Sequence, residues 1–396
     1  MSAHLSLSTR SVVLLAVASA IVTANAYYIH PIIGRVGASF GVSDAMVGAV
    51  PALNQVALAL GVLLLLPLGD RVSNRRLIAL CLTVQVLALL AMATVRDYAL
   101  FVTASTVLGF FTITPYLLPA YASKRVEAAH LGFVTAVLTT GVVIGVQLSR
   151  LGSGLVGEYL GWRAVYLIAA GLMAVAVVTL PTLMTEEPVQ KGARHLPYPA
   201  LLRTLFGLAR SNSDVMVSGL IQGLSFAIFL ATWLGMGLYL TGPALGLGTD
   251  VVGYLAAASA VGLATTPWLG RWADRRGAER SRLIMVCVQF AAVLSLGQAP
   301  IAWPLLLVPI LVTSIAGPLI DVTGRMTSLS RPPEIRTRLM SLYITLMFLG
   351  GGFGSWMGTA AYDWGGWWGT VAFTTVMSTL VCALSARQYA RRRAVA

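Results

Sequence analysis

The chain has 396 residues, of which 57% are hydrophobic and only 10% are charged. Soluble domains carry about 25% charged residues, so this composition excludes a soluble protein and indicates a polytopic membrane protein. Because apolar residues extend over the whole length, a large extramembrane domain is excluded as well.

Apolar runs long enough to span a bilayer follow one another along the chain, since a span needs about 20 residues. The first six lie at 11–33, 45–68, 77–95, 98–122, 131–157 and 163–184, and the other six at 214–241, 251–272, 282–300, 303–329, 336–361 and 367–387. The runs are continuous rather than alternating, and only helices or closed barrels satisfy the backbone in lipid. We therefore predict an all-α membrane protein with twelve transmembrane helices. Its parts are an N-terminal six-helix bundle (1–184), a cytoplasmic linker (185–213) and a C-terminal six-helix bundle (214–396).

The positive charges predict how these helices are oriented. Of the 27 Lys and Arg residues, 22 fall on the side that carries both termini, three fall on the other side, and Arg150 and Arg325 lie inside spans. Because cytoplasmic loops are enriched in Lys and Arg, we expect both termini in the cytoplasm. Contact of these loops with an anionic lipid bilayer accounts for the net charge of +13 without a nucleic-acid partner.

Sequence features of metal and nucleotide sites are absent. The three cysteines, Cys81, Cys287 and Cys382, lie inside apolar runs without a CxxC spacing, which predicts neither a disulfide framework nor a metal site. The glycine-rich run at 350–354 lacks the lysine of a nucleotide-binding loop. We expect no metal and no cofactor.

Two landmarks recur at one offset in the two halves. Asp70, in an Arg-rich segment after the second span, is matched by Asp274 after the eighth span, 204 residues later. The same offset carries 161–163 (Gly-Trp-Arg) onto 365–367 (Gly-Gly-Trp), each at the start of the sixth span of its half. This repetition indicates a duplicated six-span unit, which is typical of secondary transporters.

In these segments the chain resembles the major facilitator superfamily, whose signature loop between spans two and three reads roughly G-x-x-x-D-[RK]-x-G-[RK]-[RK]. The copy at 270–280 keeps this pattern, whereas the copy at 66–76 has Leu66 and Ser73 in place of the two glycines. The resemblance extends over essentially the full chain. It implies two pseudo-symmetric six-helix bundles around a central cavity, and transport of a small-molecule substrate by alternating access.

The signature residues form a candidate conformational latch. An Asp at a helix end can pair with flanking Arg residues and face the positive N-terminus of a neighbouring helix. By the resemblance, Asp70 faces the start of span eleven and Asp274 the start of span five, which closes the cytoplasmic side. A solvated charge cluster that only fixes topology is the alternative. The latch residues are Asp70, Arg71, Arg75, Gly270, Asp274, Arg275 and Gly277.

A looser resemblance concerns the transport reaction. The segment 26–31, Ala-Tyr-Tyr-Ile-His-Pro, resembles the N-[LI]-Y-Y-x-Q-P-L segment of bacterial efflux-type permeases of the arabinose-efflux-like group, although Ser105 stands about where drug:proton antiporters carry an Arg. The resemblance implies a monomer in the bacterial inner membrane that exports small amphipathic compounds in exchange for protons. One alternative is an importer or facilitator of a small polar metabolite. A membrane-embedded enzyme or sensor is a distant alternative, because the sequence shows no clustered set of His, Asp and Glu.

Charged residues inside spans are costly and mark functional sites. Asp321 and Arg325 lie four residues apart on one helix face, so Asp321 is either a proton carrier or half of an internal salt bridge. His30, placed near the outer end of span one, is a further candidate for proton coupling. Arg150, with Gln147 one turn away, either meets an anionic substrate group or anchors a network between helices.

The candidates for the substrate cavity are mostly uncharged and come from spans one, two, four, five and seven. Pro115 and Pro119 interrupt span four at cavity depth, where freed carbonyls can serve a ligand. The cavity candidates are Asn25, Tyr28, Asn54, Gln55, Thr112, Tyr116, Gln147, Arg150, Gln222, Phe226 and Trp233.

Overall fold

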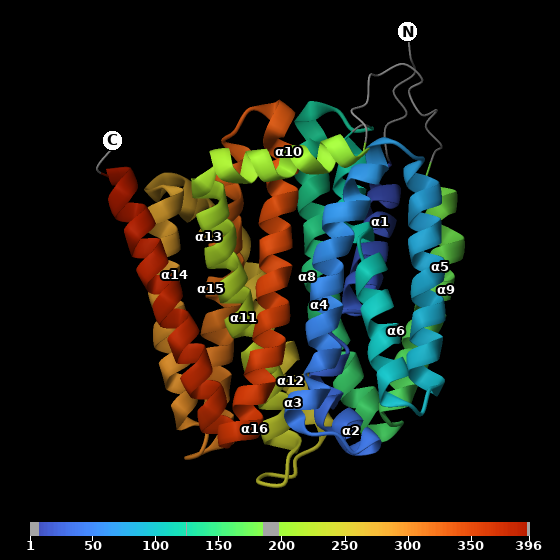
Figure 1. Cartoon of the computed structure of the whole chain (residues 1–396), viewed down its shortest axis with the longest axis vertical. Coiled ribbons are helices and arrows are strands. Elements are labelled where there is room, and N and C mark those ends of the chain that lie inside the picture. Colours follow the sequence, from blue (N-terminus) through green and yellow to red (C-terminus); the bar gives the residue numbers. More distant parts are fainter. Residues whose placement is uncertain (1–7, 124, 185–197, 394–396) are drawn as a thin grey trace.

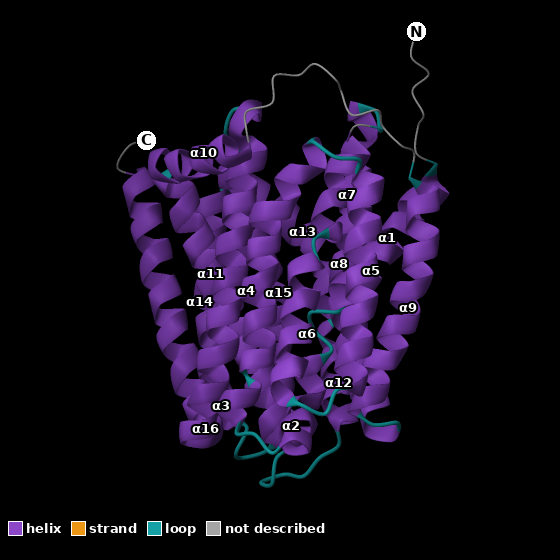
Figure 2. Cartoon of the chain, turned by 45° about the vertical axis from the view of Figure 1, so that its right-hand side comes forward, coloured by secondary structure: helices purple, strands orange, loops and turns teal. Residues whose placement is uncertain are grey.

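The computed structural model describes residues 8–123, 125–184 and 198–393, and every regular element in these ranges is a helix (Figure 1 and Figure 2). The first half comprises α1 (Thr9–Ala24), α2 (Ile29–Phe40), α3 (Asp44–Val47), α4 (Ala49–Leu65), η1 (Leu66–Asp70), α5 (Asn74–Thr94), α6 (Tyr98–Phe111), α7 (Thr114–Ser123), α8 (Ala128–Tyr159) and α9 (Trp162–Leu183). The second half comprises α10 (Tyr198–Ser211), α11 (Ser213–Thr241), α12 (Thr249–Ser259), α13 (Val261–Arg276), α14 (Ala278–Ser295), η2 (Leu296–Gln298), η3 (Trp303–Leu306), α15 (Leu307–Leu329) and α16 (Pro333–Arg393).

The expected number of membrane crossings is confirmed. Among the described residues, ten helical segments are long and apolar enough to cross a membrane. One of them, Ile335–Arg391, has 57 residues and a non-helical backbone at Gly365 and Gly366, so it crosses twice. The broken pair α12 and α13 forms the remaining span. The chain is therefore a multi-pass, all-α membrane protein of twelve transmembrane helices.

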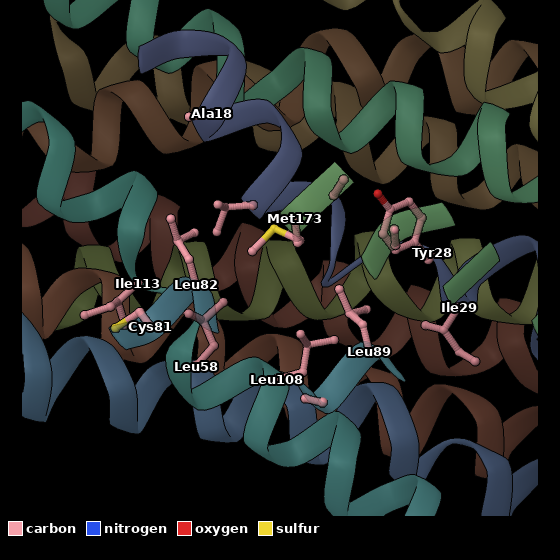
Figure 3. Packing of buried hydrophobic residues seen from close by; sticks show 14 of the residues in the cluster. Ala18, Tyr28, Ile29, Leu58, Cys81, Leu82, Leu89, Leu108, Ile113 and Met173 are labelled. Atoms are coloured by element: carbon pink, nitrogen blue, oxygen red, sulfur yellow. The ribbon is translucent and has the colours of Figure 1, made fainter. Parts of the chain in front are cut away.

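Buried apolar side chains hold each bundle together. In the N-terminal bundle, Leu58 of α4 and Leu82 of α5 belong to the same cluster as Met173 of α9 (Figure 3). A second cluster joins α11, α12, α14, α15 and α16. On the outside of the bundles, Leu87 is 62% and Val178 is 69% exposed. Exposed apolar surface of this kind faces lipid in a membrane protein.

The first span is longer than predicted. It continues to Phe40 instead of ending at 33, and it bends between α1 and α2, where residues 25–28 form turns. Pro31 explains the bend, because it has no N–H to donate to the carbonyl of Tyr27 one turn earlier. The extension corrects the depth of His30, which is fully buried within the span rather than placed near its outer end.

Pro115 has a similar effect in span four, where α6 ends at Phe111 and α7 begins at Thr114. The carbonyl of Phe111, which Pro115 leaves without its helical donor, accepts a hydrogen bond from Gln85 Nε2 at 2.9 Å. This carbonyl therefore has a partner within the protein, and the use of the freed carbonyls by a ligand stays a prediction.

The two halves share a backbone conformation at the start of their sixth span, in agreement with the repeat predicted from the sequence. Gly161 precedes α9 with φ 85°, and Gly366 precedes the last span with φ 55°. Glycine adopts this region without a Cβ clash. A buried tryptophan follows each reversal, Trp162 in the first half and Trp367 in the second.

The repeat also extends into the interior of each bundle. Gln85 of α5 and Gln289 of α14, 204 residues apart, are both buried. Asn25 Nδ2 donates to Gln85 Oε1 at 2.9 Å, and the Ser225 hydroxyl donates to Gln289 Oε1 at 3.3 Å. In each half, a glutamine of the third span thus binds the first span.

The two bundles are joined at one end. α1 begins and α16 ends at the other end, where α10 lies across the bundle (Figure 1); we call that end the terminal face and the joined end the opposite face. The Thr249 N–H donates to Glu158 Oε2 at 2.8 Å, and the Thr249 hydroxyl donates to the Gly154 carbonyl at 2.8 Å, which ties α12 to α8. Gly48 packs so closely on Thr359 of α16 that a Cβ would overlap it. The opposite face is closed.

The latch residues lie at the terminal face. Asp274 in α13 is exposed and forms no ion pair with the residues that the structure describes, and its role in a latch stays a prediction. Gly277, with φ 86°, makes the reversal from α13 into α14. The Arg71 guanidinium lies 5.6 Å from the ring centre of Tyr198 in α10. The side chain of Asp70 lies outside the described residues.

Gly48 gives a test of the closed opposite face. We expect Gly48→Ala to favour opening of this face, because the added methyl overlaps Thr359 and overpacking costs about 1–3 kcal/mol. Spin labels at the exposed positions Met46 and Trp364, introduced in a Cys287→Ser background, should report longer distances by pulsed electron paramagnetic resonance. Gly171→Ala is the control, because nothing lies within 4 Å of an added Cβ there. An unchanged distance distribution in Gly48→Ala would contradict the assignment.

Candidate functional site

α8 places an arginine in the interior of the protein. Arg150 is fully buried. Its Nε donates to His30 Nδ1 at 3.1 Å, and its Nη1 donates to Gln147 Oε1 at 3.4 Å. Because His30 accepts at Nδ1, its imidazole carries the proton on Nε2. The three side chains form a polar cluster that links α8 to α2.

Three aromatic rings surround the guanidinium group of Arg150. Its central carbon lies 4.2 Å from the ring centre of Trp233, 4.6 Å from that of Phe229 and 5.3 Å from that of Tyr27. At these distances the ring faces attract a cation. Trp233 and Phe229 belong to α11, so this contact joins the N-terminal bundle to the C-terminal bundle.

The charge of Arg150 has no carboxylate partner within the described ranges. Arg150 Nη2 and His30 Nε2 are both buried without a hydrogen-bond partner. Most buried polar groups have a partner, and a buried charge is costly unless it is paired. These N–H groups are therefore available to donate to a water molecule or a ligand.

Gln147 connects the polar cluster to the second bundle. Its Nε2 donates to the Ala256 carbonyl at 3.2 Å and to the Ser259 hydroxyl. The cluster thus extends from α2 through α8 to α12. Both roles predicted for Arg150 are compatible with this geometry, since one side of the guanidinium anchors helices and Nη2 is free to bind an anion.

A small cavity lies between the bundles. Its volume is about 10 Å³, enough for about one water molecule. Tyr27 lines it and also contacts Arg150, so the cavity adjoins the polar cluster. The lining residues include the predicted Thr112 and Tyr116 and come from both bundles: Thr23, Ala26, Tyr27, Leu58, Thr112, Pro115, Tyr116 and Phe348.

Aromatic side chains continue from Arg150 past this cavity. The successive ring centres, from Trp233 through Phe229, Phe226 and Phe348 to Tyr116, are 6.4, 5.8, 5.9 and 5.7 Å apart. We call this set the aromatic row. The sequence predicted Phe226, Trp233 and Tyr116 as cavity residues but missed Phe229 and Phe348. Phe229 follows Phe226 by three residues and precedes Trp233 by four, the spacing that places side chains on one helix face, and this signal could have found it.

The predicted pair on α15 is an ion pair. Arg325 Nε lies 2.9 Å from both carboxylate oxygens of Asp321. The hydroxyl of Tyr343, a residue that the sequence analysis missed, donates to Asp321 Oδ1 at 3.1 Å. The side chains of Asp321 and Arg325 are 25% and 30% exposed, whereas Arg150 is fully buried. The predicted salt bridge is present, and proton transfer by Asp321 stays a prediction.

Two other predicted cavity residues support the scaffold. Thr112 donates to Gln85 Oε1 at 3.3 Å, the oxygen that also accepts from Asn25. Asn54 Nδ2 donates to the Ser105 carbonyl at 2.8 Å. Gln85 was missed by sequence analysis, because a single glutamine in an apolar run gives no indication of its partners.

The remaining cavity candidates lie in different environments. Tyr28 packs in the apolar core of the N-terminal bundle. Both amide atoms of Gln55, and Oε1 of Gln222, are buried without a hydrogen-bond partner. Gln55 lies three residues before Leu58, which lines the cavity, so the two share a face of α4.

A second buried arginine was also missed. Arg282 is 1% exposed and donates to Ser218 Oγ at 3.0 Å and to Gln388 Oε1 at 3.1 Å. The sequence places it at the predicted start of span nine, among the cytoplasmic charges. α14 begins earlier, at Ala278, which brings Arg282 into the bundle.

Comparison with known proteins identifies the family of the chain. The sequence model of the Major Facilitator Superfamily matches residues 15–320. The uncharacterized transporter YgaY of Escherichia coli O157:H7 is 27% identical over 363 residues, which cover 92% of this chain and 91% of that protein. The probable transporter SCO4007 of Streptomyces coelicolor is 28% identical over 369 residues, 91% of this chain and 83% of that protein.

Solved structures of the same fold are also similar. The crystal structure of a mutant of the nucleoside transporter NupG superimposes with a TM-score of 0.76 at 15% identity, covering 96% of this chain and 98% of that one. The structure of a bacterial homolog of the human lysosomal transporter Spinster, inward-facing and unoccupied, gives a TM-score of 0.78 at 14% identity, covering 97% and 98%. At these identities the likeness establishes the fold.

The two buried arginines provide a test of whether Arg150 is structural. Arg282→Met leaves Gln388 Oε1 without its donor and breaks the buried network of Arg282, Ser218 and Gln388, and a buried polar group left unsatisfied costs about 1–3 kcal/mol. Arg150→Met also removes two hydrogen bonds, to His30 Nδ1 and Gln147 Oε1, but it relieves a buried charge whose Nη2 is unpartnered, so we expect it to lower the thermal unfolding temperature less. Both variants would be followed by thermal unfolding in detergent. An equal loss of stability in the two variants would show that Arg150 is held for structural reasons.

Proposed function

Because the chain belongs to the major facilitator superfamily and is a membrane transporter, we propose that it exports small amphipathic compounds across the bacterial inner membrane in exchange for protons. The observation that carries the proposal is the aromatic row between the two bundles, which begins at Trp233 beside Arg150. Ligand sites of this kind use apolar and aromatic surface for most of the contact and a few polar groups for orientation. The bacterial relatives, which are themselves described as transporters, support the assignment to a bacterial membrane.

The terminal face is cytoplasmic in this proposal, because it carries most of the Lys and Arg residues. The closed opposite face and the exposed Asp274 then correspond to an inward-facing state. Alternating access would open the opposite face and close the terminal one around the same cavity. The cavity lies between the two bundles of the chain, and we propose that a monomer carries out transport.

Ion gradients are the energy source in this proposal, because the sequence carries no nucleotide-binding motif. One proton that moves down 100 mV supplies about 2.3 kcal/mol. That free energy supports a gradient of approximately 50-fold, at about 1.4 kcal/mol per factor of ten.

Asp321 is the proposed proton carrier. It is the acidic side chain on α15 that is partly exposed in this state, and its carboxylate is stabilised by Arg325 and by the Tyr343 hydroxyl. A proton on Asp321 would weaken the ion pair with Arg325. We therefore assign protonation of Asp321 to a conformation in which it is separated from Arg325. In the inward-facing conformation the two side chains form an ion pair.

Asp321→Asn tests the carrier role. We expect this variant to retain exchange of substrate between the two sides, because the cavity is unchanged, but to lose accumulation driven by a pH gradient. Transport would be measured in proteoliposomes with and without an imposed gradient, against a panel of amphipathic compounds. Asp363→Asn is the matched control, since Asp363 is exposed near the opposite face. Normal gradient-driven accumulation by Asp321→Asn would remove it as the carrier.

Asp274→Asn tests the latch. The substitution removes the negative charge that is expected to face the start of α8 when the terminal face closes, an interaction of about 0.3–1 kcal/mol. We expect a shift toward the inward-facing state and slower transport, with Asp274→Glu close to the original protein. Distances between labels across the terminal face would report the shift. Full transport and an unchanged distance distribution in Asp274→Asn would contradict the latch.

A further inference from the structure

We propose that Arg150 and His30, with the rings of Tyr27, Phe229 and Trp233, bind the carboxylate of a small aromatic organic anion, which makes such anions the substrate class. The inference rests on the proposed function in one respect, that the cavity between the bundles is the transport pathway.

The first argument is the unmatched charge. Arg150 is fully buried, and no carboxylate in the described part of the chain pairs with it. The aromatic rings compensate a cation only partly. The free-energy cost of burying an arginine in a membrane protein is tolerated where the arginine has a functional partner. That partner must be an anion.

The second argument is the set of donors. Arg150 uses Nε and Nη1 within the protein, and its Nη2 is unpartnered, as is Nε2 of His30. A carboxylate has two oxygens that accept from such groups, and charge-assisted hydrogen bonds to arginine are short and strong. A neutral amide offers one acceptor and no charge, and an ammonium group offers none. These donors therefore distinguish an anionic ligand from a neutral or cationic ligand of similar size.

The third argument is the surface that would hold the rest of the ligand. The guanidinium group is in contact with three rings, and the aromatic row continues from there to Tyr116. This surface suits an aromatic or similarly flat apolar body. In the described state the cavity beside Tyr27 measures about 10 Å³, so rings of the row must move to admit the ligand.

The position of the site couples binding to the transport cycle. His30 and Arg150 belong to the N-terminal bundle, whereas Phe229 and Trp233 belong to the C-terminal one. An anion held between them adds contacts that exist only when the two bundles are apposed at this point. A ligand shifts a conformational equilibrium through such differential contacts.

The test compares ligands that differ in charge and ligands that differ in the size of their apolar part. The full-length protein in lipid nanodiscs would be titrated calorimetrically with acetate, phenylacetate and 1-naphthylacetate, and with phenylacetamide and 2-phenylethylammonium. We expect affinity to rise from acetate to 1-naphthylacetate, and phenylacetate to bind about tenfold or more tightly than phenylacetamide, the range expected for hydrogen bonds to a charged group. Failure of every carboxylate to bind at millimolar concentration overturns the proposal, and so does equal binding of phenylacetate and phenylacetamide.

Substitutions test whether the preference for phenylacetate over its amide depends on this site. Arg150→Gln should abolish the preference for phenylacetate over its amide, and Arg150→Lys should retain part of it, because the charge stays but the paired donors are lost. Arg163→Gln is the matched control, since Arg163 lies 4.1 Å from the ring centre of Trp162 at a distance from the site. An Arg150→Gln protein that folds and keeps the preference overturns the proposal. If Arg150→Gln does not fold, Arg150→Lys and Trp233→Leu carry the test, and unchanged affinities in both overturn it.

The two proposals fail separately. Binding needs no gradient, so carboxylate binding that depends on Arg150, without pH-driven accumulation, overturns the proposed function and leaves this inference standing. Conversely, gradient-driven export of neutral or cationic compounds that is unchanged in Arg150→Gln supports the proposed function and overturns the anion site.

Discussion

The hydrocarbon core of the bilayer offers no hydrogen-bond partners, so polar groups at this depth must find them within the protein. Several polar side chains of this transporter meet that constraint through partners on neighbouring helices. Pro115 interrupts span four, and the carbonyl that it frees is bound by Gln85. Gln85 in turn accepts from Asn25 and Thr112. One buried glutamine thereby makes a broken helix compatible with the membrane.

The same constraint distinguishes residues of the scaffold from residues of the candidate site. Arg282 has partners for its donors on two neighbouring helices, and it holds the C-terminal bundle together. Arg150 is equally buried but keeps Nη2 unpartnered, and His30, which accepts from Arg150 Nε, keeps Nε2 unpartnered. Two arginines with the same burial thus differ in what the chain supplies around them. The difference supports the proposal that Arg150 binds a ligand.

Much of the fold could be predicted from the sequence, because the length of the apolar runs and the offset of 204 residues between Asp70 and Asp274 depend only on residue order. The partners of polar side chains could not be predicted in the same way. Nothing local to Gln85 indicates that it binds the Phe111 carbonyl, since that contact depends on how α5 packs against α6. His30 was misplaced for a related reason, because the apolar run ends at 33 whereas amphipathic residues carry the helix on to Phe40.

The identities of the candidate residues could be predicted from the sequence more readily than the positions of their side chains. The sequence singled out Arg150, Asp321 and Arg325 because intramembrane charges are rare. It left open whether Asp321 and Arg325 form the salt bridge that the structure shows, and it did not indicate that Arg150 contacts aromatic rings and a histidine. That distinction decides which charge is available to a substrate, and it required the positions of side chains from both bundles.

The two charged sites also have consequences for energetics when they are considered together. Export of one monovalent anion in exchange for one entering proton moves two positive charges inward, so the membrane potential acts on both movements. At about 2.3 kcal/mol per charge for each 100 mV, the potential alone supplies about 4.6 kcal/mol per cycle. That is enough for a gradient of roughly 2,000-fold at about 1.4 kcal/mol per factor of ten. Exchange of a neutral compound would use half of this driving force. A buried arginine without a carboxylate partner would therefore do more than recognise the substrate: it would select the substrates whose export the membrane potential drives most strongly.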